Sequence, residues 1–132
     1  MRKGRAWAVF GAFALHNLEE AAAAPAYFER AADRMPIPWP APEPFQAATA
    51  AVTAAGLALT LVAVRRHRPD LTTLLATIML VNVVVPHVPL AIASGGYAPG
   101  LITALLLNLP IDLLWLTRHR RPAAGHPTDR NP

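Results

Sequence analysis

The sequence predicts an all-α fold, a polytopic membrane protein in which four transmembrane helices form one bundle. Composition is the first reason. Apolar residues make up 54% of the 132 residues, charged residues only 15%, and the mean hydropathy is +0.32. In soluble domains about a quarter of all residues are charged, because the surface must be polar. The absence of cysteine excludes disulfides, thiol nucleophiles and thiolate metal sites.

Four apolar stretches are the second reason. Each is close to the roughly 20 residues that cross a bilayer core of about 30 Å. They cover about residues 6–24, 47–64, 71–93 and 99–116. The charged turn from Arg65 to Asp70 is too polar to cross, and it separates the second stretch from the third. We expect residues 1–121 to form one transmembrane domain and the polar residues 122–132 to form a disordered cytoplasmic tail.

The basic residues indicate how the helices are oriented. They form three clusters: one precedes the first stretch, one separates the second stretch from the third, and one follows the fourth. They are Arg2, Lys3 and Arg5; Arg65, Arg66 and Arg68; and Arg118, Arg120, Arg121 and Arg130. Because cytoplasmic loops carry the excess of Lys and Arg, both termini are predicted to lie in the cytoplasm of a bacterium, with the helices in its inner membrane. A net charge of +4 also suits nucleic-acid binding, but the scattered arginines favour the orienting role, so no nucleic-acid partner is predicted.

The first stretch has an alternative interpretation. A basic start, residues 2–5, followed by an apolar, Ala-rich run that ends before Pro25 resembles a secretory signal peptide. Its cleavage would leave three helices. His16, Glu19 and Glu20 interrupt the run, however, and the basic C-terminal cluster fits an even number of crossings. We therefore expect the first helix to be retained.

Polar residues inside the predicted spans mark a candidate site. A charge at the bilayer centre costs about 2.5 to 3.5 kcal/mol, so such residues need a reason. They are His16, Glu19 and Glu20 in the first helix, Asn82 and His87 in the third, and Asn108 and Asp112 in the fourth. Residues at i, i+3 and i+4 share one helix face. Counting about 1.5 Å per residue from the cytoplasmic ends places all except Asp112 at similar levels, and we expect Asp112 near the cytoplasmic interface or paired with Arg118.

The polar run of the first helix carries a resemblance to a known family. His16-Asn17-Leu18-Glu19-Glu20 resembles the defining motif of the HXXEE domain family of small bacterial membrane proteins. Residues 82–87 and 97–100 are compatible with that family, and the resemblance covers about residues 10–116. The family is functionally uncharacterised, so the resemblance supports a site in this region without naming a reaction.

Two imidazoles and two carboxylates are a sufficient ligand set for Zn²⁺, Fe²⁺ or Mn²⁺. We predict three metal ligands, His16, Glu20 and His87. Glu19 is the predicted general base, and Asn82 or Asn108 would orient the substrate. The leading hypothesis is a membrane-embedded metal-dependent enzyme that acts on a lipid-like or small hydrophobic molecule.

Two other classes of function stay open. Chains of His, Glu and Asp at mid-membrane depth are typical of proton relays and transporters. Four short helices enclose only a narrow pore, so such a protein is expected to work as a homo-oligomer. The third class is structural or partner-binding, with His16 and a glutamate forming a buried polar knot. Two adjacent carboxylates argue against it, because a proton or a cation must still neutralise the second.

Overall fold

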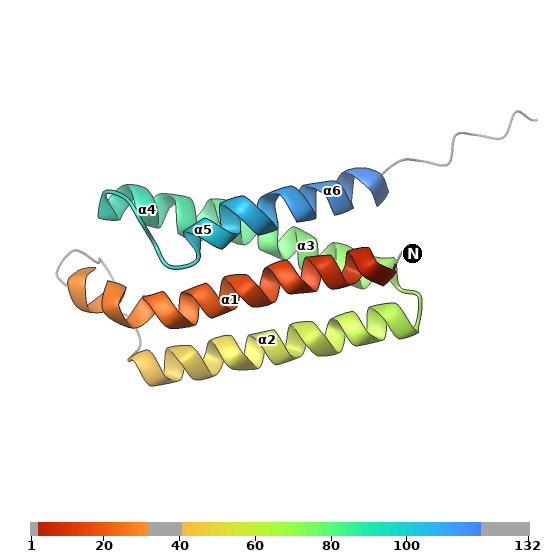
Figure 1. Ribbon diagram of the computed structural model, residues 1–132, viewed down its shortest axis with the longest axis horizontal. Helices are drawn as coiled ribbons and strands as arrows, with labels where there is room; N and C mark the ends of the chain where they lie inside the picture. The colour runs from red at the N-terminus through yellow and green to blue at the C-terminus, as the bar shows by residue number, and fades with distance from the viewer. Residues whose placement is uncertain (1–2, 32–40, 120–132) are drawn as a thin grey trace, which may run out of the picture.

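The computed structural model describes residues 3–31 and 41–119, and every regular element within them is a helix. The predicted all-α fold is therefore confirmed. The helices form four continuous runs, and each run is antiparallel to the next (Figure 1). They are α1 (Lys3–Ala31); α2 (Pro42–Arg65); α3 (Pro69–Asn82), the π-helix η2 (Val83–His87) and α4 (Val88–Ser94); and α5 (Leu101–Thr103), the π-helix η3 (Ala104–Asn108) and α6 (Leu109–His119). The tail predicted over 122–132 lies outside the described residues.

Helix α1 is the centre of the bundle. It packs against α2 on one side and against α3, α5, η3 and α6 on the other. Figure 1 shows α1 between α2 and the pair formed by α3 and α6. A polar side chain on the inner face of α1 therefore meets the third and fourth runs, where the other candidate residues lie.

Three of the described helical runs are long and apolar enough to cross a membrane. They are Pro42–Arg65, Pro69–Ser94 and Leu101–Arg118. α1 is not among them, although it is the longest single helix. Its composition explains the difference, because Glu19 and Glu20 interrupt its apolar run and Glu29 and Arg30 end it.

Proline explains why the third and fourth runs each contain a π-helical segment. Pro86 lies within η2, and Pro110 follows η3 by two residues. A proline has no N–H, so the carbonyl one turn earlier loses its partner and the helix widens locally. Such segments occur often at functional sites. Here Asn82 precedes η2, His87 ends it, and Asn108 ends η3.

The apolar core lies at the end of the bundle where α1 begins. It is built from α1, α3 and α6 and consists of Ala6, Val9, Phe13, Leu75, Ala76, Met79, Trp115 and Leu116. Trp115 Nε1 donates a hydrogen bond of 3.0 Å to Thr73 Oγ1, which sets the register of α6 against α3. Gly56 lets α2 come close to α1 at this core, because a Cβ there would collide with the ring of Phe13.

Candidate metal centre

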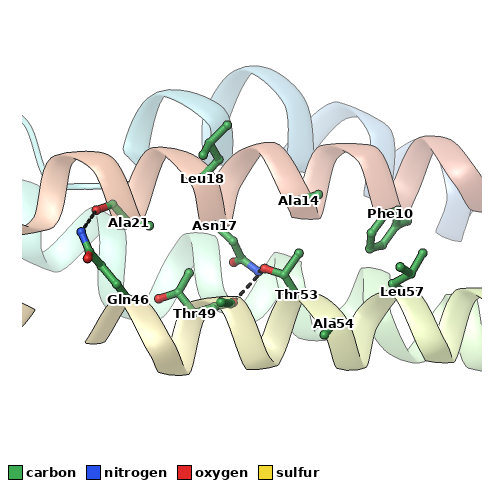
Figure 2. Close-up of a pocket in the computed structure, with 11 residues that line it drawn as sticks. Phe10, Ala14, Asn17, Leu18, Ala21, Gln46, Thr49, Thr53, Ala54 and Leu57 are labelled. Atoms are coloured by element: carbon green, nitrogen blue, oxygen red, sulfur yellow. Dashed lines mark hydrogen bonds between the residues drawn. The ribbon is translucent and has the colours of Figure 1, made fainter. Parts of the chain in front are cut away.

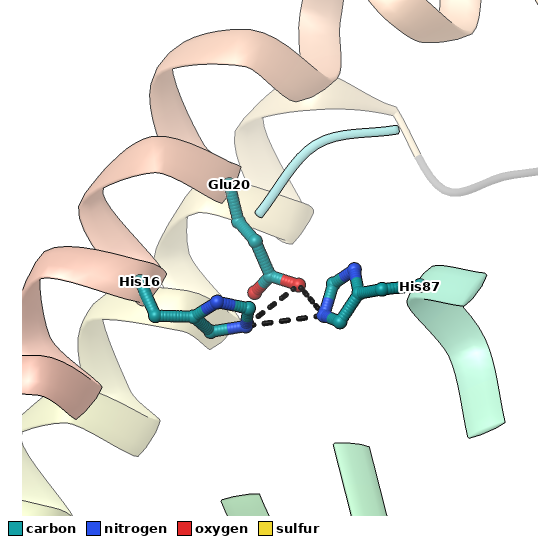
Figure 3. A group of neighbouring side chains, drawn as sticks. All are labelled: His16, Glu20 and His87. Atoms are coloured by element: carbon teal, nitrogen blue, oxygen red, sulfur yellow. Dashed lines mark hydrogen bonds and ion pairs between the residues drawn. The ribbon is translucent and has the colours of Figure 1, made fainter. Parts of the chain in front are cut away.

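The three predicted metal ligands meet in the structure (Figure 3). His16 Nε2 lies 3.1 Å from His87 Nε2 and 3.5 Å from Glu20 Oε1, and His87 Nε2 lies 3.3 Å from the same oxygen. His16 and Glu20 lie one turn apart on α1, while His87 comes from the end of η2. The histidines are 0% and 3% exposed and Glu20 is 21% exposed. The group is therefore buried on the histidine side and open beside Glu20.

The hydrogen bonds of His16 define which of its nitrogens carries the proton. Nδ1 lies 3.1 Å from the carbonyl oxygen of Gly100 and 3.3 Å from Thr103 Oγ1. A carbonyl oxygen only accepts, so Nδ1 is the nitrogen that donates to Gly100. The lone pair of Nε2 then points at His87 and Glu20. A backbone carbonyl that holds the far nitrogen of a histidine in this way is the usual outer contact of a metal ligand.

The spacing of the three ligand atoms suits a tetrahedral ion. With metal–ligand bonds of about 2.0 to 2.1 Å, two ligands of a tetrahedral zinc ion lie roughly 3.3 Å apart. The observed edges of 3.1, 3.3 and 3.5 Å bracket that value. Three electron-rich atoms this close together repel unless a cation or a proton lies among them.

Asn82 lies against the two histidines. Its Nδ2 is 3.1 Å from His16 Nε2 and 3.0 Å from His87 Nε2. The amide of Asn82 therefore lies within hydrogen-bonding distance of the same two nitrogens that form the ligand group. The structure therefore places Asn82 beside the ligand group, as the substrate-orienting role requires.

Glu19 points to the start of the fourth run and not into the ligand group. Its carboxylate accepts hydrogen bonds from two backbone N–H groups in the first turn of α5 and from two hydroxyl groups. The donors are Tyr97 Oη at 2.8 Å, Ile102 N at 3.3 Å, Thr103 N at 2.8 Å and Thr103 Oγ1 at 2.6 Å. A carboxylate at this position satisfies N–H groups that have no partner within their helix. Proton transfer by Glu19 stays a prediction, while helix capping is its observed contact.

The cap also reaches the ligand group through Thr103. The hydroxyl of Thr103 donates to Glu19 and lies within hydrogen-bonding distance of His16 Nδ1. Burial, together with the hydrogen bond to Glu19 and the charge of that carboxylate, raises the pKa of Tyr97 to about 12, so its hydroxyl stays a donor. Glu19 therefore holds Thr103, and Thr103 contacts the ring nitrogen of His16 that faces away from the ligand group.

Gly100 closes over the ligand group, and sequence reasoning did not single it out. Its φ is +82°, in the left-handed region that favours glycine. A Cβ on Gly100 would lie 2.7 Å from His16 Cε1, 2.8 Å from Glu20 Cγ and 2.9 Å from His87 Cε1. The glycine at the start of the fourth apolar stretch was the available signal, but nothing in the sequence indicated which side chains it would meet.

The remaining candidates, Asn108 and Asp112, lie in the fourth run and are both 0% exposed. In the part of the chain that the structure describes, neither side chain has a hydrogen-bond partner. The expected pairing of Asp112 with Arg118 is not found among the described residues. The side chain of Asp112 points into the bundle, so it is buried and not exposed, and its depth in a membrane stays a prediction.

A groove of about 510 Å³ lies elsewhere, between α1 and α2 (Figure 2). Its walls are mostly apolar, and its polar groups are paired, with Asn17 donating to Thr53 Oγ1 at 2.8 Å and Gln46 donating to the carbonyl oxygen of Ala21 at 3.1 Å. None of the three ligand residues lines it. The groove therefore belongs to a different face of α1 from the ligand group.

These features define a class of protein: a small helical bundle with membrane-length apolar helices and a His–Glu–His group where α1 meets the third and fourth runs. The chain belongs to the family described as "Protein of unknown function with HXXEE motif", which matches residues 7–115. In this chain the motif letters are His16, Glu19 and Glu20. Two of them are ligand candidates and the third caps α5.

One curated relative was found. The chain is 44% identical over 36 residues to "Uncharacterized protein YrkK" of Bacillus subtilis (strain 168), and the match covers 27% of this chain and 23% of that protein. The chain therefore aligns with less than a quarter of the relative's length. No solved structure matches this chain.

Proposed function

We propose that this protein is a zinc-dependent hydrolase of the bacterial inner membrane that acts on a lipid-like or small hydrophobic substrate. One observation carries the proposal, the triangle formed by His16 Nε2, His87 Nε2 and Glu20 Oε1 with edges of 3.1 to 3.5 Å. Two histidines and one glutamate are a ligand set of catalytic zinc, which keeps its fourth position open.

Zinc narrows the reaction type. It has no redox chemistry, and in a three-ligand site it supplies a water nucleophile at neutral pH. The exposed side of Glu20 is the open approach to the group. Asn82, whose amide lies about 3 Å from both ligand nitrogens, is placed to donate to a polar group of the substrate. Thr103 and Gly100 hold His16 in the tautomer that offers Nε2.

The membrane arrangement that we propose has four crossings and cytoplasmic termini. The direction of the α1 side chains supports the crossing of this helix. His16 is fully buried, whereas Leu15 and Leu18 are 51% and 64% exposed and face outward. Large aliphatic residues are similarly exposed on the other runs, with Ile92 at 76% and Leu106 at 69%. An outer surface of this kind suits contact with lipid.

The test is the metal content of detergent-purified protein, measured by mass spectrometry after purification without chelators. We expect near-stoichiometric zinc in the wild type and its loss in His16→Ala, His87→Ala and Glu20→Gln. His67→Asn and Glu29→Gln are matched controls, because both residues are exposed and lie away from the group. A wild type that stays free of metal after incubation with Zn²⁺, Fe²⁺ or Mn²⁺ would remove the enzyme proposal.

A proton relay is the second candidate, and the 3.1 Å contact between His16 Nε2 and His87 Nε2 favours it. Two imidazoles this close to a carboxylate are able to share one proton. In that case no metal binds, and liposomes containing the protein show pH-dependent flux that Glu20→Gln abolishes. A purely structural role predicts neither metal nor flux, and only a loss of stability in His16→Ala.

A further inference from the structure

A second buried polar group lies in the fourth run, apart from the ligand group. Asn108 ends η3 and Asp112 follows one turn later in α6, so the two side chains share a helix face. Both are 0% exposed. Both oxygens of Asp112 and both polar atoms of the Asn108 amide lack a hydrogen-bond partner within residues 3–31 and 41–119.

The position of the pair in the bundle follows from the helix contacts. Asn108 and Asp112 continue the buried stripe of the fourth run that includes Trp115 and Leu116, and this stripe packs against α1 and α3. The hydrogen bond from Trp115 to Thr73 sets the register of α6 against the antiparallel α3. One turn back from Trp115, Asp112 is therefore level with the turn of α3 that follows Thr73, where Leu75 and Ala76 belong to the apolar core.

An ionised Asp112 would be costly at this place. A buried carboxylate without a partner loses its hydration and gains nothing in return. Among the described residues, Asp112 forms no ion pair with Lys, Arg or His. Its charge must therefore be neutralised either by a bound proton or by a small cation.

Asn108 decides between these two possibilities. A cation would coordinate the oxygens of Asp112 and Asn108, but it would leave the N–H groups of the amide without an acceptor. Water both donates and accepts, and buried water typically makes about three hydrogen bonds to such groups. We propose that Asn108 and Asp112 form an internal proton-binding site, in which Asp112 is a neutral carboxylic acid linked to Asn108 through buried water.

The helix contacts place Asn108 close to the segment that ends at His87. η3, which Asn108 ends, packs against η2, which His87 ends. Asn108 therefore lies on the segment that adjoins the His87 side of the ligand group, and Asp112 lies one turn further from it. The binding of the proton itself does not depend on the presence of a metal, so the zinc proposal and this one fail separately.

Infrared spectroscopy of the full chain in lipid tests the proposal. We expect the carbonyl stretch of a protonated carboxylic acid at neutral pH, and we expect isotope labelling of aspartate to shift it in the wild-type protein. The band should disappear in Asp112→Asn and persist in the matched control Asp70→Asn, whose residue is exposed and paired with Arg68. Transfer to D₂O should shift the band, because the acid contacts exchangeable water.

Asn108→Leu gives a second measurement that keeps the acid. Because the acid of Asp112 loses its link to Asn108 in this variant, its carbonyl band should move to higher frequency and should not disappear. Absence of an aspartate band in the labelled wild type would overturn the proposal. So would a thermal midpoint that rises with Na⁺ or K⁺ in the wild type but not in Asp112→Asn, since that result identifies a cation site.

Discussion

The ligand group and the pair Asn108–Asp112 are buried polar groups of the described residues that differ in how their atoms are satisfied. At the ligand group, the backbone of Gly100 and the side chains of Thr103 and Asn82 contact the two histidines. At Asn108 and Asp112, neither side chain has a protein partner in the described residues. In the first group three ligand atoms lie within 3.5 Å of one another, which suits an ion, although Nδ1 of His87 has no hydrogen-bond partner in the described residues. The second is positioned by its helix alone, which suits small molecules that adapt to it.

The two neighbouring glutamates show the same contrast within one motif. Glu20 lies beside His16 and His87, and Glu19 lies at the first turn of α5. Consecutive residues point about 100° apart around a helix, so they must serve different neighbours. Glu20 belongs to the group that could hold a metal ion, and Glu19 caps the element whose Thr103 contacts His16. The motif therefore combines a site and its support.

The largest expected effect comes from Gly100→Ala. The added methyl group meets His16, Glu20 and His87 at 2.7 to 2.9 Å, and the left-handed backbone adds about 1 to 2 kcal/mol of strain. We expect zinc affinity to fall about 100-fold or more, since the ligands themselves are displaced. Competition titration with a chromophoric chelator measures the loss.

Gly56→Ala is the matched control for that change. Its methyl group collides with Phe13, away from the ligand group, and should cost about 1 to 3 kcal/mol of stability. Zinc affinity of the folded protein should stay within about threefold of the wild type. Equal losses of zinc binding in the two variants would show that Gly100 acts through general stability and not through the site.

Glu19→Gln and Glu20→Gln separate support from ligation. Glu20→Gln removes the carboxylate ligand and should abolish stoichiometric binding. Glu19→Gln keeps all three ligands but weakens the bonds to Thr103 that orient His16, so affinity should fall about 10-fold. Isothermal titration with Zn²⁺ distinguishes the two. Complete loss of binding in Glu19→Gln would identify Glu19 as a ligand.

Much of this arrangement is predictable from the sequence. Composition and the four apolar stretches predict the all-α fold, and the spacing of His16 and Glu20 places both on one face of α1. The sequence alone did not show that His87 meets that face. The meeting depends on the π-helical turn at Pro86 and on the packing of α1 against the third run, which are long-range effects.

Other features could not be predicted from the sequence, for a related reason. Gly100, and the helix start that Glu19 caps, are about 80 residues away in the chain from the α1 residues that they contact. The burial of Asp112 was not predicted, because the helical position of a residue does not reveal which face of the bundle it occupies. Local spacing predicts which residues of one helix share a face, but only tertiary packing decides what that face touches.

A smaller effect is expected from apolar replacement of the unpartnered pair. Asp112→Leu alone leaves Asn108 without its water partners and should cost about 1 to 3 kcal/mol. The double variant Asn108→Leu/Asp112→Leu removes both polar groups and should recover most of that loss. Reversible unfolding in detergent measures the free energies, with zinc content unchanged throughout. Additive destabilisation in the double variant would show that the two side chains do not share a site.

The smallest effect concerns Tyr97, at the outer edge of the cap. Its pKa of about 12 lies above the ordinary value of 10 because burial and the bond to Glu19 favour the neutral hydroxyl. The resulting stabilisation is present below pH 10 and is lost as the pH rises through about 12. The chain has two tyrosines, so tyrosinate absorbance should be followed in a Tyr27→Phe background. The midpoint should move toward 10 in Glu19→Gln, whereas a midpoint near 10 with Glu19 intact would mean that the cap does not hold Tyr97 in solution.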